Sequence, residues 1–309
     1  MSTNYSRRDF GKMVLAGVPF TLLAPPSSKI NGVQIGAITY SFRGINDANE
    51  IIKAMAKIGL TEVELMSNHA ESLAGMPQPQ RGARGGTPPT PEQVAAQQAA
   101  QKATADWRKA TTADTFKAVA RKFDAAGIDV RLLCYNMNRN TPDDEIEYAF
   151  MMAKGLGAKA ISSSTQVSVA KRVAPFADKH KIMVGFHGHS NITDPEEFAK
   201  PESFAEAMSF SKYFGANLDI GHFTAANYDA VAYINEHHAR ITNLHLKDRK
   251  KNQGPNVPWG EGETPIKEVL RLLRQKKWDI PANIEFEYQG QDSVAEVAKC
   301  YQFCKDALA

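Results

Sequence analysis

The sequence has few of the features that would place it outside ordinary globular proteins. Its 309 residues include three cysteines, Cys134, Cys300 and Cys304, and so few predict no disulfide framework. The formal net charge is +3 and no long basic run accompanies it, which argues against a nucleic-acid partner. No apolar stretch after the first 25 residues is long enough to span a membrane. What remains, 43% hydrophobic and 23% charged, suits one large α/β domain or two smaller ones.

The first 28 residues have the organisation of an export signal. Ser6–Lys12 reads SRRDFGK, an apolar run over Met13–Ala24 follows, and Pro25-Pro26 ends it. Paired arginines before a modest apolar run are typical of twin-arginine signals, which export folded proteins. An amphipathic helix with two incidental arginines is the alternative. The order of the segments favours a signal over residues 1–28, and therefore a soluble periplasmic domain over residues 29–309.

After residue 30, short β-rich runs alternate with helical patterns. The expected strands are Val33–Ser41, Glu62–Met66, Asp129–Tyr135, Lys159–Ser163, Ile182–Phe186, Asn217–Ile220, Ile241–Leu246 and Asn283–Phe286. The expected helices are Asp47–Ile58, Asp114–Ala126, Asp143–Leu156, Val167–His180, Pro201–Phe214, Tyr228–His237, Pro265–Lys276 and Ser293–Leu308. Eight such β-then-α units predict a (β/α)₈ barrel. A doubly wound open sheet is disfavoured, because no glycine-rich dinucleotide fingerprint follows the first strand.

A long interruption, at about residues 70–112, separates the second strand from its helix. It is rich in Ala, Gln, Pro and Gly, and we expect an irregular loop over Met76–Pro91 followed by a polar, alanine-rich helix over Pro91–Thr111. Because it follows a strand, the insertion emerges on the face where barrels carry their active sites. A lid, an arm for a homo-oligomer and a disordered surface insertion all remain open.

Four of the expected strands end in polar side chains that a buried strand tolerates only when something uses them. These segments are VGFHGHS (Val184–Ser190), NLDIGHF (Asn217–Phe223), ITNLHLKD (Ile241–Asp248) and NIEFEY (Asn283–Tyr288). Side chains at i and i+2 share one face of a strand, and the C-terminal ends of barrel strands surround one pocket. We therefore expect four inward side chains at similar depth: His187, Asp219, His245 and Glu285.

Two imidazoles and two carboxylates form a mixed nitrogen and oxygen site that suits Mn²⁺, Co²⁺, Zn²⁺, Fe²⁺ or Mg²⁺. The same alternation turns His189, Lys247 and Glu287 toward the mouth, and places His222 on the loop that follows its strand. A single inward histidine is usually a hydrogen-bonded core residue, and a single glutamate at a strand end is often an ion-pair partner. Four such residues at matched strand ends favour a metal site.

These motifs resemble the xylose-isomerase-like barrel superfamily, the sugar phosphate isomerase/epimerase group that includes ketose 3-epimerases. The matching segments are GLTEVEL at the second strand, LDIGH at the sixth, HLKD with a later WGEG at the seventh, and IEFE at the eighth. The resemblance covers about residues 33–308. It implies that Asp219, His245 and Glu285 bind a metal and that His222 contacts substrate hydroxyls. It also implies that Glu64 lines the pocket and that Trp259–Gly262 closes beside it.

One departure from the family pattern concerns the fifth strand. The family usually has a glutamate there, in a pattern like LENH, whereas this chain has Phe186–His189, FHGH. His189 matches the family's histidine, and His187 replaces the carboxylate. In the epimerases that glutamate and the one at the eighth strand are an acid/base pair flanking one sugar carbon. A histidine at this position can still bind a metal and can act as a base, since the ordinary pKa of histidine is near neutral pH. Because one carboxylate of the acid/base pair is missing, however, plain epimerisation is in question.

The same superfamily contains DNA-repair endonucleases with three zinc ions. Those enzymes need further ligands, notably an Asp-x-His pair after the seventh strand. This chain has NVPW at Asn256–Trp259, and its third strand carries no histidine. His69, after the second strand, does not make up the deficit, so we reject an endonuclease.

We expect a divalent-metal enzyme that removes a proton next to a metal-bound carbonyl of a sugar or keto-sugar, through an enediolate. The expected bases are Glu285 or His187, with His189 orienting oxygens or protonating a leaving atom. Reprotonation gives isomerisation or epimerisation, whereas loss of a neighbouring glycosidic oxygen gives a 3-keto-glycoside lyase by β-elimination. A non-catalytic periplasmic sugar-binding barrel is the third interpretation. The expected substrate contacts are His222, Lys247, Glu64, Trp259 and Glu287.

Export and the lack of a phosphate-binding motif argue against sugar phosphates. The sequence therefore favours a free sugar, a keto-sugar or a glycoside as the small-molecule partner, with no nucleic acid and no membrane once the signal is removed.

Overall fold

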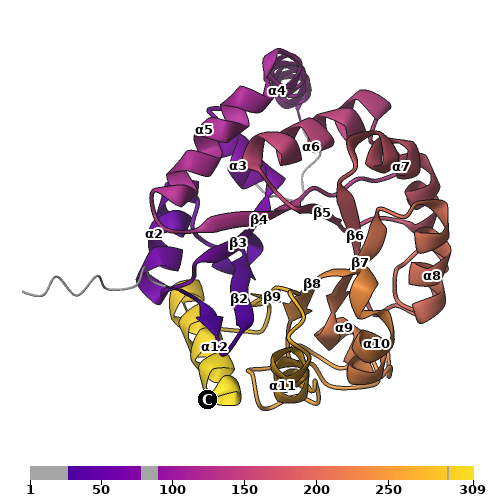
Figure 1. Ribbon diagram of the computed structural model, residues 1–309. Helices are drawn as coiled ribbons and strands as arrows, with labels where there is room; N and C mark the ends of the chain where they lie inside the picture. Colours follow the sequence, from indigo (N-terminus) through magenta and orange to yellow (C-terminus); the bar gives the residue numbers. More distant parts are fainter. Residues whose placement is uncertain (1–26, 78–89, 291) are drawn as a thin grey trace, which may run out of the picture.

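The computed structural model describes residues 27–77, 90–290 and 292–309. Within them, eight parallel strands close into a barrel that Figure 1 shows along its axis, surrounded by helices. Strand β9 pairs back with β2, at Gly36↔Asn283 among other positions, and so closes the sheet. The predicted (β/α)₈ barrel is confirmed. The predicted export signal, apart from its last two residues, and most of the predicted loop over Met76–Pro91 lie outside the described residues.

The barrel strands are short and mostly buried on both faces, as parallel strands covered by helices must be. They are β2 (Val33–Ile38), β3 (Glu62–Met66), β4 (Asp129–Cys134), β5 (Ala160–Ser163), β6 (Met183–His187), β7 (Phe214–Asp219), β8 (Ile241–Leu246) and β9 (Ala282–Ile284). A two-residue strand, β1 (Lys29–Ile30), pairs antiparallel with β2 beside the barrel.

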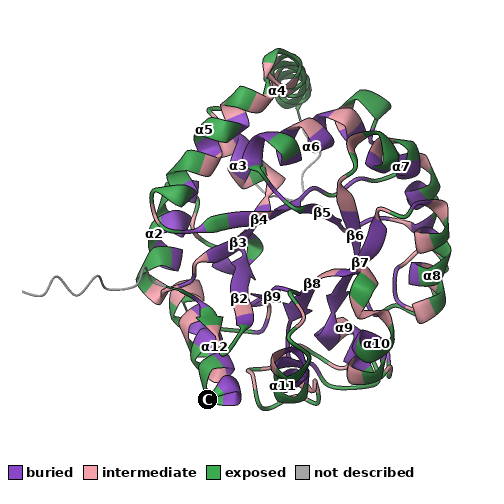
Figure 2. Ribbon diagram, in the orientation of Figure 1, coloured by how far each residue is buried: buried purple, intermediate pink, exposed green. Residues whose placement is uncertain are grey.

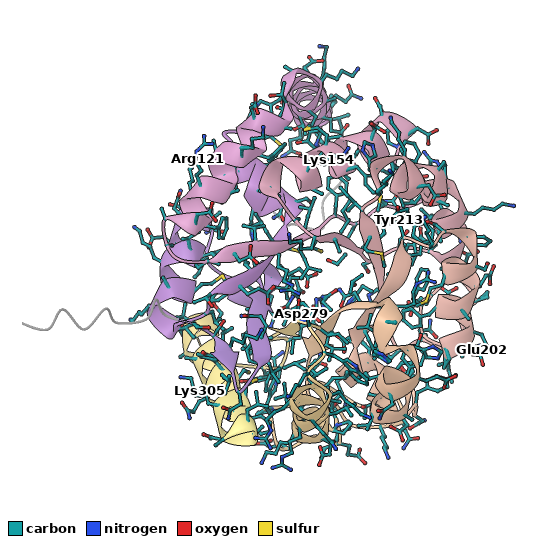
Figure 3. All side chains as sticks on the ribbon, in the orientation of Figure 1. Arg121, Lys154, Glu202, Tyr213, Asp279 and Lys305 are labelled. Atoms are coloured by element: carbon teal, nitrogen blue, oxygen red, sulfur yellow. The ribbon has the colours of Figure 1, made fainter. Side chains whose placement is uncertain are left out.

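Most of the helices bury one face against the strands and expose the other, as Figure 2 shows. They are η1 (Thr39–Phe42), α2 (Ala48–Ile58), α3 (Ser67–Leu73), α4 (Pro91–Ala110), α5 (Ala113–Asp124), α6 (Asp143–Leu156), α7 (Val167–His180), α8 (Pro201–Phe210), α9 (Ile220–Ala225), α10 (Ala230–His237), η2 (His238–Arg240), α11 (Ile266–Lys276) and α12 (Ser293–Leu308). Charged side chains such as Arg121, Glu202 and Lys305 lie on the outer surface (Figure 3). No helix of the described residues is both long and apolar enough to cross a membrane.

The sequence misplaces the boundaries around the sixth barrel strand. The helix expected to reach Phe214 ends at Phe210, and Phe214 instead begins β7. Ser211 makes the break, because its hydroxyl accepts from the backbone N–H of Tyr213 at 3.0 Å and bonds to Asp178 at 2.6 Å. An apolar pattern that runs through the turn hides this break from the sequence.

The far end of that strand also differs from the expectation. Ile220 does not continue the strand but opens the short helix α9, and His222 therefore lies on a helix rather than on a loop. At the last strand, β9 ends at Ile284, before the predicted Phe286. Glu285 still continues the ladder for one bond, since its N–H donates to the carbonyl of Leu246 at 3.0 Å.

The predicted insertion helix is present as α4, which opens with a capping box between Thr90 and Gln93. None of its residues is buried, and Figure 1 shows it at the outer edge of the helix ring rather than across the barrel. Arg108 fastens its C-terminal end, with Nε 2.7 Å from Glu71 Oε1 and Nη1 2.8 Å from Glu145 Oε1. Within the predicted insertion, Pro91–Ala110 is therefore a polar helix tied to the flank of the barrel, whereas Ala70–Leu73 belongs to α3 and is largely buried.

Candidate metal centre

Four side chains from neighbouring strand ends converge at the C-terminal end of the barrel. They end β6 and β7, lie within β8 and directly follow β9, and they are His187, Asp219, His245 and Glu285. Each offers one ligand atom, and these atoms all lie within 4.8 Å of one another. All four residues are buried. The side chains that the sequence placed at similar depth on four strands do meet in space.

Asp219 divides its carboxylate oxygens between the backbone and this cluster. Oδ1 accepts from the backbone N–H of His222 at 2.7 Å and so caps α9. Oδ2 is buried without a hydrogen-bond partner among the described residues, although Nζ of Lys247 lies 3.0 Å away as an ion-pair partner. Burial raises the pKa of this carboxyl above its ordinary value. Oδ2 is thus a ligand atom that the protein itself does not satisfy.

His187 offers a second unsatisfied ligand atom. Its Nδ1 is buried and has no hydrogen-bond partner in the described part of the chain. Burial, together with the ring of His245 at a centroid distance of 4.7 Å, holds the pKa of His187 well below its usual value, so the imidazole is neutral. Buried polar atoms are normally paired, and metal ligands must be unprotonated. The donor set therefore fits a divalent metal ion.

His245 lies between two carboxylates, one at each ring nitrogen. Nδ1 is 3.1 Å from Glu285 Oε2, and Nε2 is 2.7 Å from Glu64 Oε2. Although burial lowers the pKa of His245, Glu64 and Glu285 together raise it well above the usual value. A histidine ligand commonly donates its second N–H to a carboxylate, which fixes the ring. Glu64 stands in that relation to His245, which leaves Nδ1 on the side of the cluster.

Glu64 does not line open space, contrary to the expectation that it contacts substrate. It is fully buried, and its carboxylate accepts hydrogen bonds from four side chains: Ser162, Asn243 at 2.9 Å, Asn283 at 3.0 Å and His245 at 2.7 Å. These partners come from β5, β8 and β9, across the barrel interior. Glu64 is therefore a buried residue that positions His245. The alternation of side chains along a strand shows that Glu64 points inward, but it does not show whether the side chain is buried or faces a pocket.

Lys247 places a buried ammonium group beside the cluster. Its Nζ lies 2.6 Å from Glu287 Oε2, 2.8 Å from Glu285 Oε2 and 3.0 Å from Asp219 Oδ2. Burial opposes the charge, but Asp219 and Glu285 raise the pKa of Lys247 above its ordinary value. Lys247 and His245 in turn hold the pKa of Glu285 well below the usual range against the effect of burial. Both groups are therefore charged.

The remaining predicted imidazoles border the same cluster. The ring of His189 lies 4.9 Å from that of His187 and 5.4 Å from that of His222, measured between centroids. Nε2 of His189 is 3.1 Å from the hydroxyl of Ser164, which directly follows β5. Burial lowers the pKa of His189, and burial and Lys247 hold that of His222 well below its usual value. The site therefore has a wall of neutral imidazoles.

Asp248 organises the loop between β8 and α11, a role that the sequence did not assign. Its carboxylate accepts from the backbone N–H groups of Gly260 at 2.8 Å, Gly262 at 3.0 Å and Thr264 at 3.2 Å. A side chain at Gly262 would meet Asp248 Oδ1, with the Cβ at 1.8 Å. Trp259, expected to contact substrate, packs edge-on against Phe303 of α12 at 5.7 Å between centroids. The sequence feature that could have predicted this role of Asp248 is the later Gly260–Gly262 segment, GEG, whose glycines let the backbone approach a carboxylate closely.

Arg249 is a second residue at the site that sequence reasoning missed. Its guanidinium is buried, with Nη1 2.6 Å from Nδ1 of His222 and 3.0 Å from the hydroxyl of Ser190. Glu287, which was expected to contact substrate, is partly exposed at the same end of the barrel and pairs with Lys247. Nothing in the spacing of charged residues marks Arg249, because its partner His222 lies on α9, 27 positions earlier in the chain.

The fold and this cluster define a class: a (β/α)₈ barrel with a candidate metal centre of two imidazoles and two carboxylates at its C-terminal end. The family described as the xylose isomerase-like TIM barrel matches residues 162–305, a little under half of the chain. The matched segment contains all four residues of the cluster.

Curated relatives include the L-ribulose-5-phosphate 3-epimerase UlaE of Salmonella paratyphi A, 24% identical over 66% of this chain and 80% of the relative. The UlaE protein of Escherichia coli O1:K1 is 27% identical over 43% of this chain and 50% of the relative. Among solved structures, 3-keto-D-glucoside 4-epimerase YcjR from E. coli aligns with a TM-score of 0.61 at 10% identity, over 89% of this chain and 99% of that one. A sugar phosphate isomerase/epimerase from Parabacteroides distasonis aligns with a TM-score of 0.59 at 15% identity, over 88% and 93%. The structural likenesses show a shared fold.

Proposed function

We propose that this protein is a divalent-metal-dependent carbohydrate enzyme of the isomerase/epimerase type, which takes a proton from a carbon next to a carbonyl group. The observation that carries the proposal is the pair of unsatisfied buried ligand atoms, His187 Nδ1 and Asp219 Oδ2, within one His/Asp/His/Glu cluster. The similarity to curated ketose phosphate 3-epimerases supports this reaction class.

The same four residues that form the cluster would hold the metal ion. When bound, the ion would supply Lewis acidity toward the oxygens of a carbonyl and an adjacent hydroxyl group. Glu64 would keep Nε2 of His245 protonated by accepting from it at 2.7 Å, so that Nδ1 stays available as a ligand. The metal could be Mn²⁺, Co²⁺, Zn²⁺, Fe²⁺ or Mg²⁺, since the mixed donor set suits all of them.

The chain's own residues would divide the proton chemistry between them. Glu285 or His187 would take the proton, since Glu285 is ionised and His187 is neutral. Lys247, charged and 2.8 Å from Glu285, would donate a hydrogen bond to a substrate oxygen or stabilise negative charge there. His189 and His222 would orient the remaining oxygens from the imidazole wall.

One observation supports a second reaction, β-elimination from a 3-keto-glycoside. Epimerisation needs a base on each face of one carbon, and the resemblance places a carboxylate where this chain has His187. A neutral buried imidazole there is less suited to return a proton to the opposite face than to serve as a ligand. Elimination needs one base and a donor for the departing oxygen, and His189 and His222 are both at hand.

The deciding experiment incubates metal-loaded protein in D₂O with ketoses and, separately, with 3-keto-glucosides, and follows the products by NMR. Deuterium at a sugar carbon without cleavage supports the isomerase/epimerase; release of the aglycone supports the lyase. Binding with neither outcome would leave a non-catalytic sugar-binding barrel and sink both catalytic proposals. Protein stripped of metal by a chelator is the control, and it should show neither product.

We also propose that residues 1–28 are a twin-arginine export signal, so that the barrel works in the periplasm on a free sugar, keto-sugar or glycoside. The proposal rests on the sequence SRRDFGK before the apolar run. Fractionation of cells that express the full chain should find the protein in the periplasm. Changing Arg7 and Arg8 to Lys should retain it inside the cell, and unchanged export of that variant would refute the twin-arginine route.

A further inference from the structure

His222 lies between two cationic side chains, and they make conflicting demands on its ring. Nδ1 is 2.6 Å from Nη1 of Arg249, and Nε2 is 3.1 Å from Nζ of Lys247. Arginine and charged lysine only donate hydrogen bonds, and a neutral imidazole has a single acceptor nitrogen. A third positive charge between these two cations is disfavoured, so the ring is neutral. One of the two contacts therefore cannot be a hydrogen bond.

Arg249 is the partner with the fixed position. Its Nε and Nη2 donate to the carbonyl oxygen of Gly254 at 3.1 and 2.7 Å, and one N–H of Nη1 donates to the Ser190 hydroxyl at 3.0 Å. The second N–H of Nη1 points to Nδ1 of His222 at 2.6 Å, the shortest of these four contacts. None of the four distances is longer than a normal hydrogen bond. A proton on Nδ1 of His222 would face the N–H of Arg249, and the guanidinium could avoid this clash only by giving up its hydrogen bonds to Gly254 and Ser190.

Lys247, in contrast, does not need His222 as an acceptor. Its ammonium group forms ion pairs with the carboxylates of Glu287 at 2.6 Å and Glu285 at 2.8 Å, and Asp219 Oδ2 adds a third negative charge 3.0 Å away without a hydrogen bond. The conflict at His222 is therefore resolved in favour of Arg249.

We propose that Arg249 is a positioning residue that holds His222 as the Nε2–H tautomer, so that the ring presents a proton rather than a lone pair to the substrate. Nε2 lies 4.0 Å from Asp219 Oδ2, so this proton is on the side of the candidate metal centre. The Nε2–H group then donates a hydrogen bond to a substrate oxygen that can only accept one, such as a carbonyl or glycosidic oxygen. That last step rests on the proposed function, whereas the tautomer does not.

The tautomer is tested by ¹⁵N NMR of the full chain labelled at histidine, with and without Mg²⁺ or Zn²⁺ and without substrate. The signals of His222 are identified by their loss in His222→Gln. We expect an unprotonated Nδ1 and a protonated Nε2 in the unaltered protein. Arg249→Met should shift the ring toward the Nδ1–H form, while Ser190→Ala, which removes the other partner of Nη1, should leave the tautomer unchanged.

A His222 ring protonated at Nδ1 in the unaltered protein, or an Nε2–H ring that persists in Arg249→Met, overturns the inference. If Arg249→Met does not fold, the spectra of the unaltered protein and of Ser190→Ala still decide. In the D₂O assay, Arg249→Met should lower kcat about 100-fold with little change in KM, because a donor to the reacting oxygens is lost. An Nε2–H ring in a protein that exchanges no proton with D₂O would sink the proposed function and leave the tautomer standing.

Discussion

At the scale of single residues, Asp219 shows how one side chain serves both the fold and the candidate centre. Its Oδ1 caps α9 through the N–H of His222, which fixes the carboxylate in place. Its Oδ2 is then held among the ligand atoms of the cluster without a hydrogen bond among the described residues. The capping contact thus prepares the orientation of the ligand atom before any ion binds, which lowers the cost of ordering the site.

Replacing Asp219 with Asn should remove most of the bound metal. An amide keeps an oxygen for the cap but removes the charge that a divalent ion needs, so we expect metal content after dialysis to fall about tenfold or more. Inductively coupled plasma mass spectrometry measures this. Asp124→Asn, at the exposed end of α5, makes the same charge change and should retain the metal. Full metal content in Asp219→Asn would refute the site.

Glu64 also acts as a single residue, because it influences the metal site through its contact with the imidazole ring of His245. Glu64→Gln exchanges a carboxylate acceptor for an amide at Nε2 of His245, so we expect metal affinity to fall about 10- to 100-fold. Titration calorimetry with Zn²⁺ or Mn²⁺ measures the change. Glu62→Gln is the matched control, since Glu62 is buried two residues earlier on β3 and has no hydrogen-bond partner among the described side chains. Equal affinities for the two variants would show that Glu64 does not orient His245.

At the scale of elements, the loop between β8 and α11 is held by one carboxylate. Asp248 follows β8 directly, so the strand that carries His245 and Lys247 also anchors the loop. Its three backbone contacts at Gly260, Gly262 and Thr264 are charge-assisted, and such bonds contribute about 2 kcal/mol each to the folded loop. The loop is therefore coupled to the position of the strand end.

Asp248→Asn should loosen this loop without unfolding the barrel. The amide group would set a donor against one of the backbone N–H donors, so we expect hydrogen exchange at Gly260 and Gly262 to accelerate about tenfold or more. Exchange measured by mass spectrometry on peptides from residues 257–264 would show it. Asp279→Asn, where the side chain is largely exposed and pairs with Arg131, is the control and should not change these peptides. Unchanged protection in Asp248→Asn would contradict the anchoring role.

At the scale of the whole molecule, two buried neutral imidazoles make the free energy of unfolding depend on pH when no metal is bound. Burial keeps His187 and His222 neutral in the folded state, with pKa values well below the ordinary value for histidine. The unfolded chain takes up these protons below about pH 6.5, so it then binds more protons than the folded chain. The contribution of these two imidazoles to the free energy of unfolding therefore decreases as the pH falls through this window, whereas the raised pKa of Asp219 acts in the opposite direction.

His187→Gln should make this acid dependence shallower. The variant removes one group that the unfolded state protonates and the folded state does not, a contribution of up to about 1.4 kcal/mol per pH unit. Urea unfolding of the metal-free protein between about pH 5 and pH 6.5 compares the two slopes. His238→Gln is the control, because His238 sits in the surface turn η2 that leads into β8. Identical slopes for the unaltered protein and His187→Gln would mean that His187 is not held neutral.

Much of the architecture follows from local patterns in the chain. Strands such as Ile241–Leu246 and helices such as Asp143–Leu156 have the predicted bounds, because alternation, caps and glycine stops act over a few residues. Where a pattern runs through a turn, as from Phe210 to Phe214, the boundary is wrong. The short helix α9 escapes prediction because its six residues are too few for a helical period to show.

The candidate cluster could also be predicted, since the side chains of a barrel strand alternate and strand ends share one mouth. That argument sets which side of a strand Asp219 or His245 occupies, but not which groups they meet there. Glu64 and His245 are 181 positions apart and hydrogen-bonded, and Arg249 reaches His222 on α9. Short-range physics in the chain thus decided the barrel and the inward set, whereas the partners, and with them the charges and tautomers of the site, were decided by tertiary packing, because they depend on distances that no local pattern encodes.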